Sequence, residues 1–349
     1  SDATPEPLHR PISDLPSPIL ETGIKIIDLF APLKRGGQVA IFTPLAGVGR
    51  RLLLGQLITS MAIRHNGCIV YLGLEDDTYK PRELILEWQA EFGMDDRVVR
   101  ERMVHLFAHA NDSTAQKQRV VETGLSFAEH LRRQGNEVLL VLENPLALTE
   151  GVIPYLKAHT SCTPESAITT LYDADHTPDA EPRAYAHLDA IITFNMDRAR
   201  EGLYPAIDPL ESRSTLLSSE LIDPNHTELV SEIKRLFKRY QGLHYMYEYR
   251  RSDGFFYLDD PKAGEQTAIR ARRLHRFLTQ PYHGGEPWTG IPGVWVSLEE
   301  TLQGCREILE GKHDDLPENA FKFIGTIDQV DATAKEINQS IEKAGRGRG

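Results

Sequence analysis

The sequence is poor in cysteine and has no long run of apolar residues. Its three cysteines, Cys68, Cys162 and Cys305, stand far apart in none of the spacings that hold a metal, so neither a disulfide framework nor a zinc ribbon is expected. No stretch approaches the ~20 apolar residues of a membrane-spanning helix, and the opening SDATPEPLHRP lacks the apolar core of a secretion signal. These absences predict a soluble cytoplasmic protein, or one that docks on the periphery of a membrane complex.

Positive charge is also scarce in this chain. The 349 residues include 39 lysines and arginines against 51 aspartates and glutamates, a net charge of −12, which argues against a general nucleic-acid binder. His159, His176 and His187 lie in no metal-binding motif such as HExxH, so surface or helix-capping roles are expected for them and no metal site is predicted. The nucleophile signature G-x-S-x-G is missing, so hydrolase chemistry of that class is not supported.

Apolar strand patterns follow a proline-rich start. Residues 1–18 hold five prolines, which predicts an extended leader. After it come continuous runs of β-branched or aromatic residues, several of them separated by helical stretches such as Ala115–Arg133, and such runs are typical of strands buried on both faces of a parallel sheet. The predicted strands are Gln38–Phe42, Cys68–Gly73, Met103–Ala108, Glu137–Glu143, Ala167–Ala174 and Ala190–Phe194.

From about Asn225 the strand patterns stop and charged amphipathic helix patterns follow. The sequence therefore predicts an α/β domain with a mostly parallel sheet over residues 19–224 and an all-α C-terminal domain over residues 225–345. The last residues, 346–349, are expected to form a disordered tail. The predicted C-terminal helices are Glu228–Tyr249, Gly264–Leu278, Leu298–Glu310 and Ala332–Ala344.

The loop TPLAGVGRRL joins the first predicted strand to a helix, which is where a phosphate-binding loop belongs. A working loop reads G-x-x-x-x-G-K-[ST], because glycines let backbone N–H groups converge on phosphate, the lysine reaches the terminal phosphates and the hydroxyl holds magnesium. Gly47 and Gly49 are present, but Arg50 and Arg51 replace the lysine and the hydroxyl, and Pro44 removes a backbone donor. Two interpretations stay open: a vestigial turn, or a loop in which Arg50 binds phosphate as a planar fork.

Five sequence blocks carry a family resemblance over almost the whole chain. In order they are ETGIKIIDLFAPLKRGGQVAIF, AGVG, AYAHLDA with GLYPAIDPLES, RFLTQPY, and WTGIPGVWVSLEETLQGCREILEGKHDDLPENAF. Together they resemble the β subunit of the rotary ATP synthase. The resemblance implies a RecA-like P-loop nucleotide-binding domain followed by a helical domain, ATP or ADP as the ligand, and assembly in an alternating hexameric ring.

The residues that act on phosphate in that family are largely replaced here. The resemblance puts the family's P-loop lysine and threonine at Arg50 and Arg51. The family's Gly-Glu-Arg-Thr, whose glutamate positions the attacking water and whose arginine contacts phosphate, corresponds to Glu75–Thr78, with Asp76 for the glutamate and Asp77 for the arginine. Because like charges near a triphosphate cost several kcal/mol in a low-dielectric site, Asp77 argues most strongly against catalysis.

The positions of the magnesium ligand and the arginine finger differ as well. The family's Walker B aspartate corresponds to Glu143, which can still reach a magnesium-bound water, and an arginine a few residues later corresponds to Ala147. The finger arginine, which contributes about 10³ to 10⁵ in rate, corresponds to Thr215. The nearest arginine, Arg213, lies two positions upstream and is not expected to replace it.

The adenine pocket of the family is better kept. Tyr204, Tyr282, Gly285 and Trp288 take the positions of its aromatic residues and of the small residue between two of them. Aromatic faces stack on adenine for about 1 to 3 kcal/mol each. The other interpretation is ordinary packing where two domains meet.

Other departures from the family concern assembly. The sequence begins at the linker PLHRP, where the family's N-terminal β-barrel ends, so we expect the contacts of that barrel to be absent. The stretch VIPYLKAHTSCTPES is much shorter than the family's stalk-facing loop. In place of an acidic lever segment the chain has RRSDGFFYLDD, with an aromatic cluster at Phe255, Phe256 and Tyr257.

A basic helix is expected in AIRARRLHRF. Such a helix can bind nucleic acid or an acidic partner, whereas the alternative is a solvated or salt-bridged face. We favour the second interpretation because the family has a similarly basic stretch there. The arginines concerned are Arg270, Arg272, Arg273 and Arg276.

The resulting hypothesis is a pseudo-ATPase: a structural or regulatory subunit with weak or no binding of ATP or ADP, which packs against itself or a homologous α- or β-type subunit and not against nucleic acid. Two alternatives stay open. An active ATPase would use Asp76 or Glu75 to activate water and Glu143 to hold Mg²⁺. A nucleotide-free interaction module would use the aromatic cluster at residues 255–257 as an exposed anchor.

Overall fold

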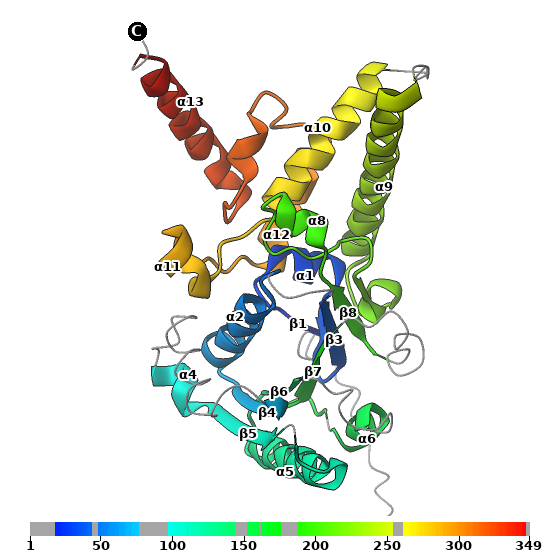
Figure 1. Ribbon diagram of the computed structural model, residues 1–349, viewed down its shortest axis with the longest axis vertical. Helices are drawn as coiled ribbons and strands as arrows, with labels where there is room; N and C mark the ends of the chain where they lie inside the picture. Colours follow the sequence, from blue (N-terminus) through cyan, green and yellow to red (C-terminus); the bar gives the residue numbers. More distant parts are fainter. Residues whose placement is uncertain are drawn as a thin grey trace, which may run out of the picture.

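The protein consists of a β-sheet between layers of helices, with further helices beyond one end of it (Figure 1). Among the helices that the structure describes, none is long and apolar enough to cross a membrane. The computed structural model describes residues 18–43, 48–76, 97–109, 111–143, 152–160, 162–175, 188–253 and 261–346.

The main sheet has seven strands in the order β5-β4-β6-β7-β3-β8-β9. Neighbouring strands run parallel, except that β9 (Arg213–Ser214) pairs antiparallel with β8. All six predicted strands are present, and the prediction of a mostly parallel sheet is confirmed. Their bounds are β3 (Gln38–Thr43), β4 (Cys68–Asp76), β5 (Met103–His109), β6 (Val138–Glu143), β7 (Ile168–Asp175) and β8 (Ala190–Thr193).

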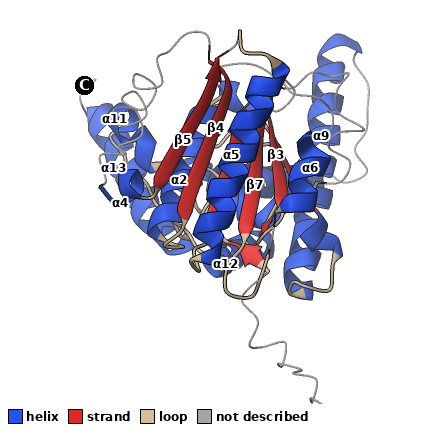
Figure 2. Ribbon diagram, turned by 90° about the horizontal axis from the view of Figure 1, so that it is seen from below, coloured by secondary structure: helices blue, strands red, loops and turns tan. Residues whose placement is uncertain are grey.

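Both faces of this sheet are covered, which explains why its strands are apolar throughout. Val39 and Ile41 of β3 pack in one hydrophobic core, while Ala40 and Phe42 belong to another on the opposite face. The first core contains α1 (Lys25–Phe30) and α2 (Arg50–Ile63), and the second contains residues of α5 (Thr114–Arg133) and α6 (Val152–His159). Figure 2 shows α5 and α6 lying over the strands.

The sequence patterns missed only short elements. Two-residue strands β1 (Ile19–Leu20) and β2 (Leu33–Lys34) pair antiparallel, and a third short strand, β9, closes one edge of the main sheet. Elements this short bury too few residues to leave a periodic pattern. The short helices are α4 (Arg97–Glu101), α8 (Met196–Arg200), the 3₁₀ turn at Thr215–Ser218, the 3₁₀ turn at His283–Gly285 and α11 (Glu286–Thr289).

Beyond the sheet the chain is helical among its described residues. In α12, Ser297 forms a capping box, since its hydroxyl accepts from the Glu300 N–H at 3.2 Å and the Glu300 carboxylate accepts from the Ser297 N–H at 2.9 Å. Figure 1 shows α9 and α10 side by side and α13 leading away from them. The helices are α9 (Pro224–Asp253), α10 (Pro261–Phe277), α12 (Leu298–Glu310) and α13 (Val330–Arg346).

The arginines of α10 are ion-paired, as the salt-bridged interpretation predicted. Arg270 and Arg273 pair with Asp314 at 2.8 and 2.9 Å. Arg272 and Arg276 pair with Glu318 at 2.7 and 3.0 Å. These bonds fasten the segment after α12 onto α10, so this basic stretch stabilises the helical domain.

A buried lysine links α1 to the C-terminal part of the chain. Lys25 is fully buried, its ammonium donates to the carbonyls of Ile324 and Gly325 at 2.7 and 3.0 Å, and it lies 4.3 Å from the centre of the Phe277 ring. The side-chain amide of Gln280 bonds to the backbone of the same segment. Its oxygen accepts from the Lys25 N–H at 3.0 Å, and its nitrogen donates to the Gly23 carbonyl. Burial lowers the pKa of Lys25 from 10.5 to about 7.

We expect Lys25→Met to lower the free energy of unfolding by about 2 to 4 kcal/mol at pH 7, because two buried carbonyls lose their donor. Between pH 7 and 10.5 the unfolded chain holds a proton on Lys25 that the native state has lost, so unfolding becomes harder as pH rises. The gap between the two proteins should therefore widen by about 1 kcal/mol per pH unit in urea titrations at pH 7.5 and 9.5. A constant gap would contradict this assignment.

Candidate functional site

The predicted phosphate site lies at the carboxyl edge of the parallel sheet. β3 ends there at Thr43 and α2 begins at Arg50. On the strands beside β3, Asp173 of β7 stands opposite Ile41 on one side and opposite Glu143 of β6 on the other. Asp173 thus meets Arg50 at the start of a helix, with Glu143 on the neighbouring strand, at the edge where ligands bind in α/β sheets.

Arg50 faces a carboxylate of the protein itself. Its Nη1 lies 3.5 Å from Oδ1 of Asp173, a distance typical of an ion pair and longer than a good hydrogen bond. The Asp173 side chain is 1% exposed, whereas the Arg50 side chain is 26% exposed. Gly49 caps the helix with φ of +87°, a left-handed conformation that glycine adopts without strain, and so directs Arg50 over the strand ends.

Glu143 is engaged on the same edge. Its Oε2 accepts a hydrogen bond from the Tyr71 hydroxyl at 2.7 Å. The pKa of Tyr71 is raised well above its usual value, first because the ring is buried and then because of the Glu143 charge; the Asp173 charge adds to this rise and Arg50 opposes it. Tyr71 therefore stays protonated and donates its hydrogen bond to Glu143.

Tyr204, one of the positions predicted for an adenine pocket, lies beside this edge. A methyl group placed on Gly49 would lie 3.7 Å from the Tyr204 ring, so Tyr204 stands next to the start of α2. The Tyr204 carbonyl accepts from the N–H of Gln280, two residues before Tyr282. Tyr282 is buried, its hydroxyl has no hydrogen-bond partner among the described residues, and burial raises its pKa well above the usual value.

The turn after Tyr282 is held against α2. The N–H of His283 donates to the Gln56 side-chain oxygen at 3.1 Å, and Gly285 is buried two residues later. Trp288 belongs to α11, which follows directly, but its side chain lies outside the described residues. Tyr204 thus lies beside the start of α2, and the turn that carries Tyr282 and Gly285 is bonded to Gln56 of the same helix.

Other predicted positions either lie at the surface or fall outside the described residues. Arg51 is exposed on α2, and Arg213 is exposed on β9. Asp76 ends β4 opposite His109, with its side chain outside the described part of the chain. Gly47, Asp77, Ala147, His176, His187 and the aromatic cluster at residues 255–257 also lie outside the described residues.

Sequence reasoning missed Asp173, the partner of Arg50. The strand ITTLYDAD carries Asp173 near its end, but nothing in this pattern marks that residue as the partner of Arg50. Sequence reasoning also missed Tyr71, since nothing in CIVYLG marks its hydroxyl as a donor to Glu143. Both contacts depend on the strand order, in which β6 lies between β4 and β7.

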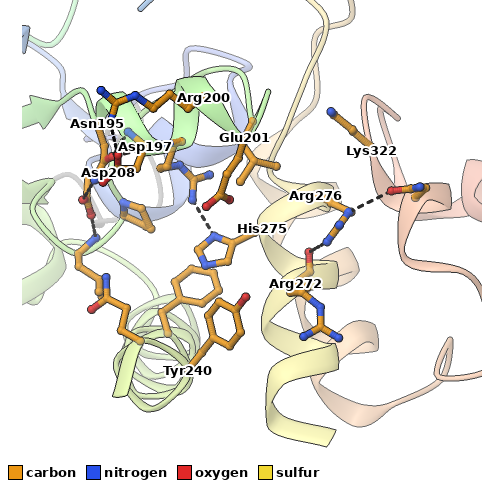
Figure 3. A pocket seen from close by; sticks show the side chains of 17 residues that line it. Asn195, Asp197, Arg200, Glu201, Asp208, Tyr240, Arg272, His275, Arg276 and Lys322 are labelled. Atoms are coloured by element: carbon orange, nitrogen blue, oxygen red, sulfur yellow. Dashed lines mark hydrogen bonds and ion pairs between the residues drawn. The ribbon is translucent and has the colours of Figure 1, made fainter. Parts of the chain in front are cut away.

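A separate cavity of about 940 Å³ lies where α8 meets α9 and α10 (Figure 3). Arg198 and His275 meet in it at 2.7 Å, and burial lowers the pKa of Arg198 to about 10 and that of His275 well below its usual value. None of the predicted nucleotide-site residues lines this cavity. No group of three or more acidic, histidine or cysteine side chains suited to a metal occurs among the residues that the structure describes.

Comparison with known proteins agrees with this geometry. Residues 23–151 match the family model of the ATP synthase alpha/beta family, nucleotide-binding domain. Among solved structures, an ATPase from the type III secretion system of pathogenic bacteria superposes with a TM-score of 0.64 at 19% sequence identity, over 88% of this chain and 88% of that chain. The resemblance to the ATP synthase family is thereby confirmed for the nucleotide-binding part, and the RecA-like fold with a helical C-terminal region is confirmed for the chain.

Replacing Tyr71 by phenylalanine tests the electrostatics of the site. We expect Tyr71→Phe to lower the free energy of unfolding by about 1.5 to 3 kcal/mol, because the Glu143 carboxylate loses a buried donor. Tyr155→Phe is the matched control, since the ring of Tyr155 stacks on His159 at the surface helix α6 and should change stability by less than about 0.5 kcal/mol. Equal effects of the two changes in chemical denaturation would show that Glu143 does not depend on Tyr71.

Proposed function

We propose that this chain, which matches the ATP synthase α/β family over its nucleotide-binding part, is a pseudo-ATPase that acts as a structural or regulatory subunit. One observation carries the proposal: the arginine at the P-loop lysine position is ion-paired with the buried carboxylate of Asp173. The group that should meet the terminal phosphates of a nucleotide is thus neutralised from inside the protein.

The residues present also fit magnesium poorly. Of the two positions that would hold it, one is the exposed Arg51, which brings a positive charge in place of a hydroxyl. The other, Glu143, shares its carboxylate with the Tyr71 hydroxyl. A hard divalent cation prefers an octahedron of oxygen ligands, and one glutamate is a poor start for it.

The adenine side supports weak binding of ATP or ADP. Tyr204 lies beside the start of α2, where a base can stack on its ring, and the buried hydroxyl of Tyr282 leaves a polar group for a ligand to satisfy. Stacking of about 1 to 3 kcal/mol per base gives an affinity in the millimolar range or weaker when no phosphate contact adds to it. Gly49 and Arg50 belong to the proposed binding surface, with Glu143 and Asp76 at the positions where a catalytic relative acts.

Calorimetric titration with ATP and ADP, with and without Mg²⁺, tests the nucleotide part of the proposal. We expect millimolar or weaker affinity that Mg²⁺ does not improve, because the ion lacks its ligands. Micromolar affinity that requires Mg²⁺ would contradict the proposal. So would turnover of about 1 s⁻¹ or faster that Glu143→Gln abolishes, since it would favour an active ATPase.

The structural role is tested by assembly. We expect the chain to form oligomers with itself, or with a homologous α- or β-type subunit, including one held in a membrane-associated complex. Sedimentation of the chain alone and mixed with a catalytic homologue measures both possibilities. A chain that remains monomeric at micromolar concentration and binds no homologue would contradict a subunit role.

A further inference from the structure

Asp173 occupies an unusual place for a carboxylate. β7 lies in the interior of the sheet, between β6 and β3, and the Asp173 side chain is 1% exposed. A carboxylate so deeply buried costs several kcal/mol unless a cation neutralises it. The cation that the structure provides is Arg50, which comes from a helix rather than from the sheet.

The two partners differ in their access to solvent. Arg50 keeps 26% of its side-chain surface exposed, so an external anion can approach it, whereas Asp173 is closed off. An incoming phosphate would therefore compete with Asp173 for the same guanidinium. It would also meet the Glu143 carboxylate, which stands opposite Asp173 on the neighbouring strand.

Charge balance then decides that competition. Among the described residues, the carboxylates of Asp173 and Glu143 lie at these strand ends together with the guanidinium of Arg50. After burial, both carboxylates raise the pKa of Tyr71, and Arg50 opposes that rise. Adding the negative charges of a polyphosphate to such a site is unfavourable at low dielectric. Removing the charge of Asp173 would take away one internal competitor for the Arg50 guanidinium.

We propose that Asp173 is the affinity-setting residue of this site: an internal counter-anion that holds Arg50 and so excludes the phosphates of nucleoside di- and triphosphates. This inference rests on the proposed function and adds the residue responsible for it. In this proposal the weak affinity for nucleotides has two causes, the Arg50–Asp173 ion pair and the altered phosphate-binding loop.

The test is a double-mutant cycle with Asp173→Asn and Arg50→Ala. Asparagine keeps the shape of aspartate and removes its charge, so Asp173→Asn should bind ATP and inorganic pyrophosphate at least about tenfold more tightly than the wild type, measured without Mg²⁺ by calorimetry. In the Arg50→Ala background the same change should give no gain. The coupling between the two positions isolates the pair from other effects.

A matched control removes a different ion pair. Asp189 pairs with Lys34 at 3.2 Å, and its carboxylate also accepts from the Gln38 N–H at the start of β3, the opposite end of that strand. Asp189→Asn removes the same charge from the protein but should leave the affinity for pyrophosphate unchanged. Thermal unfolding checks that each variant is folded, and Asp173→Leu, which has a similar shape without polar atoms, replaces Asp173→Asn if the amide variant does not fold.

The outcomes separate this inference from the proposed function. If the folded Asp173 variants bind pyrophosphate no better than the wild type, or if the gain persists in Arg50→Ala, the inference is overturned and the pseudo-ATPase proposal is unaffected. If the wild type itself binds Mg-ATP at micromolar concentration and hydrolyses it, the proposed function fails whatever Asp173 does. A gain confined to variants that keep Arg50 supports the inference.

Discussion

Helices cover both faces of the parallel sheet, so polar side chains of its strands can reach solvent or a partner mainly at the strand ends. The position of the candidate site depends on this constraint. Residues of β3 pack alternately in the two hydrophobic cores, so charged groups gather where the strands end. Asp173 and Glu143 stand on adjacent strands near that edge, and α2 brings Arg50 to them. The site is therefore a consequence of the topology, and its electrostatic character depends on which few side chains meet there.

Those side chains satisfy one another. Arg50 faces Asp173, and Tyr71 donates to Glu143, so the interior carries its own substitutes for a ligand's charge and hydrogen bonds. A buried ion pair contributes little net stability compared with apolar packing, because desolvation offsets the attraction. The pair contributes specificity instead. When an arginine is already paired with a carboxylate of the protein, a ligand anion has to compete with that carboxylate for it.

The fold was largely predictable, and the site only in part. Continuous apolar runs identified all six long strands, since burial on both faces leaves a strong signature, whereas β9 and the β1–β2 pair are too short to leave one. Arg50 could be predicted because the phosphate-loop motif is a pattern of residues that are adjacent in the sequence. Asp173 was out of reach, since its contact with Arg50 depends on β7 lying between β3 and β6, and strand order is not written in any local pattern. The aromatic positions at Tyr204 and Tyr282 followed from family resemblance rather than from spacing.

The buried ammonium of Lys25 has a consequence for the order in which the protein is made. Its acceptors, the carbonyls of Ile324 and Gly325, emerge about 300 residues after it, which at about 5 to 20 residues per second means a delay of roughly 15 to 60 s on the ribosome. During that interval the sheet can form, but α1 has nothing to cover its lysine. Lys25 can therefore reach these two acceptors only after residues 324 and 325 have been made, so this contact is among the last that the chain can form.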